Sequence, residues 1–258
     1  SLPAQAQYYF NDIAGTLEIN RQMQTYRAGK VKTVSAAGYD KQGIKENSFS
    51  EFQEGKENGM ALRSSAISNL NKTVVYNRFD NQGRIISTID SSSALQSSIS
   101  YEYDDAGKIT RILNNVKDPA NDFNQTETHH WIYNSSGKPE KMWRIISSGA
   151  TADSLEIRFV TDENGNTAEE RTFRKGLETG YLYYYYDDKN RVTDVVRYNT
   201  KLKRLLPDFM FEYDDNDRVI QKITTTSSRN LGYLIWRYIF DAKGLKTKEA
   251  LFNDDKEL

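Results

Sequence analysis

A chain of 258 residues can form one large β domain or two ordinary ones. Its 35 basic and 36 acidic residues are mixed along the whole length, which argues against nucleic acid as a partner and against a polybasic helix that anchors to a membrane surface. Its apolar runs are too short for a transmembrane helix. With 0 cysteines, this chain has no disulfide, no thiolate metal site and no cysteine nucleophile.

The first six residues look like the end of a secretory signal peptide. Ala4-Gln5-Ala6 fits the small-x-small cleavage pattern, and Leu2-Pro3 fits the end of the apolar stretch that comes before such a site. We therefore expect residues 1–6 to be a signal-peptide remnant. The expected location is exported: periplasmic, outer-membrane-associated or extracellular.

Residues 7–30 differ in pattern from the rest of the chain. Ile13, Leu17 and Met23 stand among polar residues with helical rather than alternating spacing, and Gly29 is suited to end a helix. This segment is predicted to be an N-terminal arm with a short helix that packs on the sheet formed by the remaining residues.

The region 31–258 contains a repeated turn signature. Asp or Asn is followed three positions later by Gly, Asn or Asp, and from Asp80 onward the signature recurs every 24 to 30 positions. The gap of 40 positions between Asp40 and Asp80 leaves room for one more hairpin near 54–59. The predicted turn residues are Asp40 and Gly43, Asp80 and Gly83, Asp104 and Gly107, Asn134 and Gly137, Asp162 and Gly165, Asp187 and Asn190, Asp214 and Asp217, and Asp241 and Gly244.

Backbone geometry explains this signature. A type I turn favours Asp or Asn at its first position, where the side chain accepts a hydrogen bond from the backbone two residues on. Hairpins closed in this way often end in a residue with positive φ, which Gly adopts freely and which Asn and Asp tolerate best among the others. Asn190 and Asp217 are thus the substitutes that the dihedral requirement permits.

The residues around the turns alternate between apolar and polar. Ile99, Tyr101 and Tyr103 share one face of a strand, and the same period of two precedes the later turns. Looser connections lie between the repeats. The expected fold is all-β: an antiparallel up-and-down meander of about 16–18 strands in tandem hairpins, curved or closed into a barrel, with a short N-terminal helix. Tight turns are expected at one end of the sheet and longer loops at the other.

The string Tyr/Phe-Asp-x-x-Gly-Arg/Lys-Ile/Val resembles the YD repeat of rearrangement-hotspot (Rhs) shells and teneurins. Arg84-Ile85 and Lys108-Ile109 match it best. The chain is far shorter than a hollow toxin-enclosing shell, and its turns are spaced more widely than is usual in that family. The whole layout also resembles uncharacterised exported proteins of Gram-negative bacteria with porin-like β topology. That likeness implies a curved or closed antiparallel sheet and no known chemistry.

The sequence contains no recognisable catalytic, cofactor or metal motif. His129 and His130 are adjacent, so on a strand they point to opposite faces, and we interpret them as polar positions at the start of a strand. The acidic turn at Asp214 lacks the glycine and distal glutamate of a calcium loop. Nothing marks Glu169 and Glu170 as a hydrolytic carboxylate pair, and a solvated strand edge accounts for them.

Aromatic side chains are the one candidate for a ligand site. Sugar rings stack on exposed aromatic faces, and five tyrosines among the six residues 181–186 load both faces of one strand. The alternative is a cross-strand aromatic ladder that only stabilises the sheet. The candidate ligand-facing residues are Tyr181, Tyr183, Tyr185, Trp131, Trp143 and Trp236.

These observations favour a non-enzymatic exported scaffold or binding module that engages a carbohydrate or a cell-envelope component. An outer-membrane β-barrel with porin-like topology is the alternative, since alternating strands with long and short connections are typical of both. Charge on both faces of 169–171 and 194–197 favours the first hypothesis.

Overall fold

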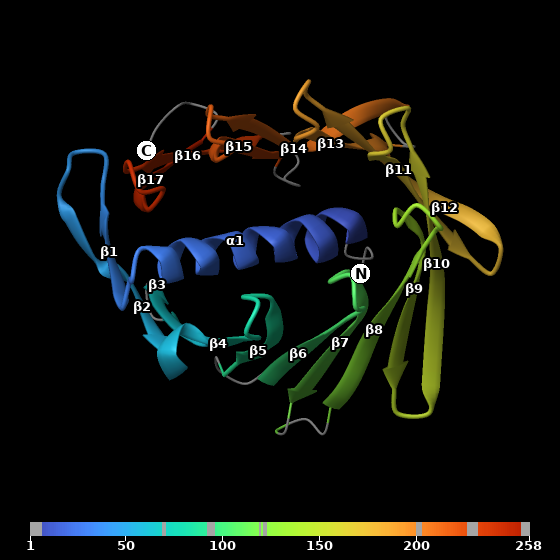
Figure 1. The fold of residues 1–258 in the computed structure, drawn as a ribbon, viewed down its shortest axis with the longest axis horizontal. Helices are drawn as coiled ribbons and strands as arrows, with labels where there is room; N and C mark the ends of the chain where they lie inside the picture. The colour runs from blue at the N-terminus through green and yellow to red at the C-terminus, as the bar shows by residue number, and fades with distance from the viewer. Residues whose placement is uncertain are drawn as a thin grey trace. The chain divides into compact units, whose positions relative to one another are not determined.

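The computed structural model describes residues 7–68, 71–91, 96–118, 120, 123–199, 203–225 and 232–253. The expected signal-peptide remnant, residues 1–6, lies outside this part. Within it, seventeen strands follow one another as an antiparallel meander behind an N-terminal helix, which confirms the expected all-β class (Figure 1). No helix among these residues has the length and apolarity needed to cross a membrane.

The chain forms two compact units, and the repeat region 31–258 contributes to both. Unit 1 is made of the described part of Ser1–Ile132 together with Lys141–Glu156. Unit 2 is made of Tyr133–Glu140 and the described part of Ile157–Leu258. The first ten strands, of which β8, β9 and β10 are divided between the units, come with the described helical segments: η1 Tyr9–Ala14, α1 Gly15–Ala28, β1 Thr33–Tyr39, β2 Lys45–Lys56, η2 Glu57–Gly59, β3 Ala61–Ser68, β4 Asn71–Phe79, β5 Ile85–Asp90, β6 Gln96–Tyr103, β7 Ile109–Asp118, β8 Phe123–Tyr133, β9 Pro139–Ser148 and β10 Thr151–Thr161.

Unit 2 continues the meander, with each strand paired to its neighbours in sequence. Several pairings shift register next to the tight turn, as a one-residue bulge does. The strands are β11 Thr167–Arg174, β12 Leu177–Tyr186, β13 Val192–Asn199, β14 Arg204–Tyr213, β15 Val219–Thr225, β16 Tyr233–Phe240 and β17 Lys246–Phe252.

The predicted turns have the backbone geometry that the signature requires. In the turn at Asp104, Oδ1 accepts the N–H of Lys108 at 2.8 Å, and the N–H of Gly107 bonds the carbonyl of Asp104 at 2.9 Å. The expected glycines have positive φ throughout, and Asn190 and Asp217 have φ of 59° and 61°. The side chain of the first residue thus satisfies backbone donors that a two-strand reversal leaves unpaired.

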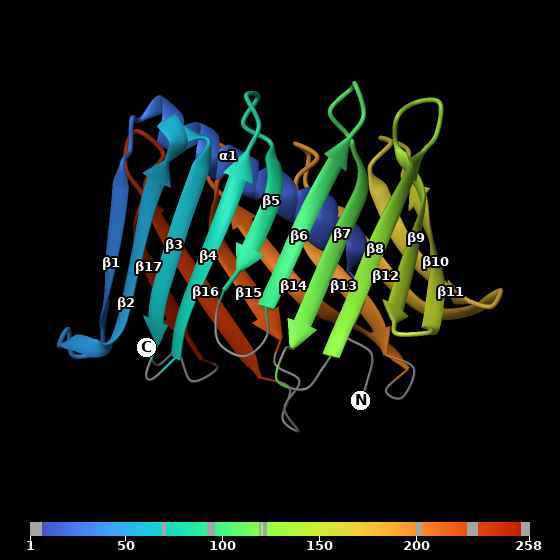
Figure 2. The ribbon, with the colours of Figure 1, turned by 90° about the horizontal axis from the view of Figure 1, so that it is seen from below.

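The turn at Asp40 lies at the opposite end of the strands from the other tight turns, contrary to the expectation that all tight turns share an end. Between Asp80 and Asp104 the chain runs through two strands and so returns to the same end. Between Asp40 and Asp80 it runs through three strands, because β2 and β3 are joined by η2, the extra hairpin predicted near 54–59. An odd number of strands brings the chain to the opposite end of the strands, and Figure 2 shows the β1–β2 turn at the end opposite to the β4–β5 and β6–β7 turns.

A positive φ at Gly107 leads to a stability prediction. Gly107 has φ of 78°, and a Cβ placed there would lie 3.2 Å from Nη1 of Arg84. Gly107→Val should therefore lower the free energy of unfolding by about 1–3 kcal/mol. The exposed neighbour Ala106 has ordinary backbone, so Ala106→Val should change it by less than about 0.5 kcal/mol. Equal melting temperatures of the two variants would contradict the turn geometry.

The core of unit 1 lies between α1 and the sheet. Met23 of α1 packs with Leu62, Phe79 and Ile85, and Ile85 is fully buried. Burying a side chain of this size stabilises a fold by about 1.5–3 kcal/mol. Ile19 and Tyr26 of α1 and Tyr101 of β6 are partly buried and pack against this cluster.

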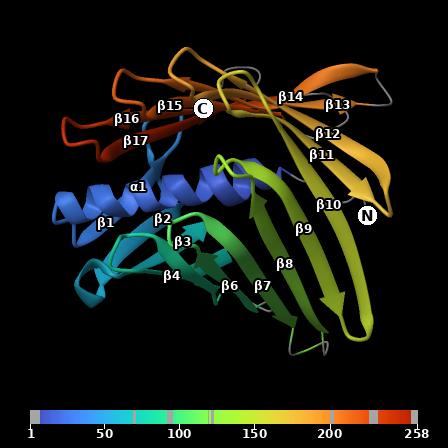
Figure 3. The same ribbon diagram turned by 45° about the vertical axis from the view of Figure 1, so that its right-hand side comes forward.

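Polar groups of α1 also contact the sheet and η2. The Oδ1 atom of Asn20 accepts the N–H of Ile85 at 2.8 Å, and the hydroxyl of Tyr26 donates to Gln53 at 2.9 Å. Nε of Arg27 donates to the carbonyl of Gly59 at 2.8 Å. These bonds place the middle of α1 against β5 and its C-terminal end against β2 and η2. Figure 3 shows α1 above β2, β3 and β4. The expected arm is thus a helix held by apolar packing and by hydrogen bonds.

Candidate functional site

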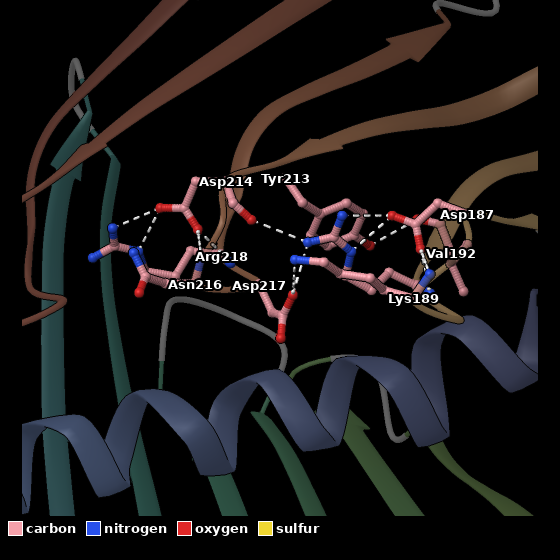
Figure 4. Close-up of polar contacts among 9 residues, drawn as sticks. Asp187, Lys189, Val192, Tyr213, Asp214, Asn216, Asp217 and Arg218 are labelled. Atoms are coloured by element: carbon pink, nitrogen blue, oxygen red, sulfur yellow. Dashed lines mark hydrogen bonds and ion pairs between the residues drawn. The ribbon is translucent and has the colours of Figure 1, made fainter.

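In unit 2, two arginines that follow tight turns bind the aspartates of those turns. Nε of Arg191 donates to Oδ2 of Asp187 in its own turn at 2.7 Å, and Arg218 binds Asp214 in the same way at 2.7 Å (Figure 4). The hydrogen bond from Arg191 holds the pKa of Asp187 below its ordinary value. Each turn is thus closed by a charge-assisted bond as well as by its backbone.

The same arginines also join each turn to the next. Nη1 of Arg191 donates to the carbonyl of Asp214 at 3.0 Å and to Oδ1 of Asp217 at 2.8 Å. Its guanidinium lies 4.6 Å from the ring centre of Tyr213, and the Tyr213 hydroxyl returns a bond to the carbonyl of Val192 at 2.7 Å (Figure 4). A stacked guanidinium with several bonded N–H groups loses little freedom, so neighbouring turns keep a fixed separation.

This turn-to-turn contact, which we call the arginine lock, occurs in both units. Arg84 stacks over Tyr103 at 4.7 Å in unit 1, and Arg218 stacks over Phe240 at 5.0 Å in unit 2. The sequence analysis placed an arginine after the turn but did not predict that it contacts the following repeat. The aromatic residue that precedes the next turn was the signal that could have shown it.

Strand β12 presents the tyrosines selected from the sequence. Tyr181 and Tyr185 are 37% and 47% exposed, and Tyr183 between them is half-buried on the same face. On the opposite face Tyr184 is buried and donates its hydroxyl to Glu170 at 2.9 Å. The period of two thus divides the aromatic run into an outward row and an inward row.

Tyr183 and Tyr185 of the outward row, together with Tyr184 and Tyr186, line an open hollow beside the turns of unit 2, which we call the tyrosine depression. Its volume is about 480 Å³, within the range of about 300–1,000 Å³ that small-molecule sites occupy. It is formed by β11, β12 and the turns that follow β10 and β12. Its lining residues are Asp162, Asn164, Ala168, Glu169, Tyr183, Tyr184, Tyr185, Tyr186, Asp187, Asp188 and Asn190.

The lining of the tyrosine depression is acidic and amidic. It contains four carboxylates and two amides, and none of its lining residues is Lys or Arg. Asp162 and Asp187 already accept backbone N–H groups within their turns, and Glu169 pairs with Arg171 at 2.6 Å. Asn164, Asp188 and Asn190 add side-chain amides and a carboxylate at the rim. Such a site accepts hydrogen bonds well and disfavours anions.

Tyr181 does not line the tyrosine depression. It stands opposite Arg171 on β11, whereas Tyr183 stands opposite Glu169, nearer the turns. A hydrogen bond with Glu178 raises the pKa of the Tyr181 hydroxyl. Tyr181 therefore extends the outward row away from the hollow.

The three tryptophans lie apart from the tyrosine row. Trp143, on β9 in unit 1, is 36% exposed. Trp236, on β16 in unit 2, stands opposite Lys222, and three strands separate β16 from β12. Trp131 is only 4% exposed, and Nε1 donates to Asp12 at 3.0 Å. The expectation that Trp131 faces a ligand is therefore wrong, because the N-terminal segment covers it.

The histidine interpretation is also corrected. His129 lies near the end of β8, not at its start, and its side chain is only 13% exposed. Nδ1 lies 2.6 Å from Oδ2 of Asp12, and Nε2 lies 2.8 Å from Oε1 of Glu127. Glu127 in turn accepts two bonds from Arg144, at 2.7 and 2.8 Å. We call these four residues the charge chain.

The charge chain escaped the sequence analysis because its members are distant in sequence. The only local signal is Glu127 two positions before His129, which places both on one face of a strand. Because the imidazole uses both nitrogens on carboxylates, it has none left for an ion. Among the described residues there is no group of three or more His, Asp or Glu side chains suited to a metal.

The adjacent glutamates on β11 do not form a catalytic pair. Glu169 belongs to the outward face with Tyr183, and Glu170 is buried against Tyr184 on the inward face. A strand places consecutive side chains on opposite sides, so the two carboxylates cannot flank one glycosidic bond.

No protein-family model matches the chain, and no curated protein matches it. Among solved structures it is similar to a crystal structure of TcdB2-TccC3-Cdc42, with 11% identity, 86% of this chain and 14% of that chain covered, and a TM-score of 0.35. The Tc holotoxin pore of Photorhabdus luminescens matches with 10% identity, 88% and 15% covered, and a TM-score of 0.29. A porin-like protein from Bacteroides uniformis matches with 10% identity, 79% and 86% covered, and a TM-score of 0.39. The chain spans about a seventh of the toxin chain in the first of these structures.

Proposed function

We propose that this protein is a non-enzymatic, exported binding module that takes a neutral carbohydrate in the tyrosine depression. The observation that carries the proposal is the pairing of Tyr183 and Tyr185 with hydrogen-bond acceptors in one hollow. An aromatic ring offers an apolar face to the C–H side of a sugar, and its hydroxyl bonds at the wet edge. Residues two apart on a strand lie about 7 Å from each other, so the two rings can contact consecutive sugar units.

The charge of the lining decides between classes of carbohydrate. Arg171 and Arg191 pair with Glu169 and Asp187, and the other two carboxylates, in a lining without Lys or Arg, disfavour uronic acids, sulfated sugars and phosphates. Sugar hydroxyls are donors, and carboxylate and amide oxygens accept from them. A neutral or amino-bearing glycan is therefore the ligand class that fits.

The carboxylates are assigned a binding role and not a catalytic one. Hydrolysis of a glycoside needs a free acid and a second carboxylate across the bond. Asp162 and Asp187 are engaged by their own turns, and Glu169 is paired with Arg171. We further propose that the hairpins are of the YD-repeat type, on the strength of the shared turn string, and that Ala4-Gln5-Ala6 marks export.

Binding can be tested with the full chain on an array of neutral and anionic glycans, followed by calorimetry with a neutral oligosaccharide retained by the array. We expect binding to neutral glycans only. Tyr183→Ala and Tyr185→Ala should each weaken binding about tenfold or more, which corresponds to about 1.4 kcal/mol.

The matched control is Tyr198→Ala. Tyr198 is 40% exposed on β13 of the same unit, and it does not line the tyrosine depression. It should leave the affinity unchanged. Retention of anionic glycans alone, no retention at all, or equal affinities for Tyr183→Ala and wild type would each overturn the proposal.

A further inference from the structure

The N-terminal helical segment covers unit 1 with an uneven set of contacts. At its C-terminal end, Arg27 donates to the carbonyls of Gly59 and Asp80, and neither of these acceptors titrates. Nearer its N-terminal end, the carboxylate of Asp12 meets His129 and Trp131 of the sheet. The contact of Arg27 therefore uses neutral acceptors, whereas the contact of Asp12 with His129 depends on a titratable group.

The charge chain at the N-terminal end alternates in sign. Asp12 comes from η1, His129 and Glu127 from β8, and Arg144 from β9. With His129 protonated, the order is negative, positive, negative, positive, so every neighbouring pair attracts. With His129 neutral, one of its nitrogens has no proton, and one of the two carboxylates loses its hydrogen bond. That carboxylate is then a buried charge that faces the lone pair of the unprotonated imidazole nitrogen.

Other elements contribute few titratable groups to this place. The ring of Tyr8 meets the His129 ring edge-on at 5.2 Å, and Tyr101 on β6 interacts electrostatically with Asp12. Asp153 on β10 acts on Arg144 at the far end of the chain of charges. His129 is the member of this set whose charge supports two carboxylates at once.

We propose that the charge chain is a pH-dependent latch, and that loss of the His129 proton releases the N-terminal end of the helix while the Arg27 end remains attached. The segment then opens as a hinged cover. Opening exposes Trp131 and His129 on β8, which Asp12 otherwise contacts.

The electrostatics set the pH window. Burial would lower the pKa of His129, but hydrogen bonds to Asp12 and Glu127 and their charges raise it to about 9. Burial would raise the pKa of Glu127, but hydrogen bonds from His129 and Arg144 lower it to about 2. A raised histidine pKa stabilises fully below the ordinary value of 6.5 and is lost as pH rises through about 9. On the acid side, the contribution of Glu127 is lost as pH falls from 4.5 through about 2.

Hydrogen exchange of the full chain between pH 7 and pH 10, corrected for intrinsic exchange rates, tests the latch. The equilibrium for opening of residues 9–20 should rise on the order of a hundredfold over this range. Residues 22–28 and the strands of both units should change much less. If residues 9–20 show no rise, or if the strands open in parallel with them, the latch does not exist.

His129→Gln supplies the matched variant, because glutamine keeps hydrogen-bonding capacity and does not titrate. In this variant, residues 9–20 should already be open at pH 7, with no further rise by pH 10. A variant that retains the wild-type pH dependence overturns the proposal. Should His129→Gln fail to fold, the wild-type series still decides, since it compares segments within one molecule.

Discussion

Asp12→Ala is expected to lower the free energy of unfolding by about 3–5 kcal/mol at pH 7, the range for removing one partner of a buried ion pair. The carboxylate of Asp12 is the acceptor for both the His129 ring and the Trp131 indole, and Asp12 is 8% exposed. Its loss leaves a buried imidazolium with one counter-ion fewer and a buried indole N–H without that acceptor. Urea unfolding followed by tryptophan fluorescence and circular dichroism measures the change.

Glu18→Ala is the matched control for this substitution. It also removes a carboxylate from the N-terminal helical segment, but Glu18 is exposed on α1. Its effect should stay within about 0.5 kcal/mol. The penalty of Asp12→Ala should also shrink at pH 10, where His129 is neutral. Equal unfolding midpoints for the two variants at pH 7 would show that Asp12 holds nothing in place.

Ile85→Ala is expected to cost about 2–5 kcal/mol through loss of burial and the cavity that remains. Ile85 is 0% exposed and packs with Met23 of the helix and with Leu62 and Phe79 of the sheet. The substitution removes the contact that joins helix and sheet, and its own N–H bond to Asn20 is unaffected because it belongs to the backbone. Chemical denaturation of the full chain gives the value.

The neighbouring residue provides an internal comparison. Ile86 has the same side chain but is 37% exposed, because the next position on a strand points to the opposite face. Ile86→Ala should cost less than about 1 kcal/mol. The reverse order of the two variants would mean that the apolar core of unit 1 lies on the other face of the sheet.

Local features of the fold were predictable from sequence because local forces produce them. The turn at Asp104 depends on a side-chain oxygen, two backbone N–H groups and one residue with positive φ, all within five positions. The alternation of apolar and polar residues on the flanking strands is also a local property, because successive side chains of a strand point to opposite faces. The end of the strands at which the Asp40 turn lies was not predictable from the turn itself, because it depends on how many strands separate it from the next turn. The hairpin at Glu57–Gly59 makes that number odd.

The contacts that hold the helical segment were beyond the reach of pattern analysis. Asp12 and His129 are 117 positions apart, and neither stands in a motif. Two adjacent histidines on a strand were correctly expected to face opposite ways, but that rule does not say which face is covered. The outward tyrosines were found because period two sorts them without any tertiary knowledge, whereas the burial of Trp131 requires it.

The arginine locks give the row of turns a direction. Arg191 reaches forward to Asp214, and Arg218 reaches forward to Asp241, so each donor acts on its C-terminal neighbour. At the Asp241 turn, Leu245 occupies the position of the arginine. This turn accepts a hydrogen bond from Arg218, but it has no guanidinium of its own to donate to a later turn. Hairpins are therefore not interchangeable modules: a grafted copy would couple to its successor only if it carries its own guanidinium, and to its predecessor only through an aromatic ring ahead of its aspartate.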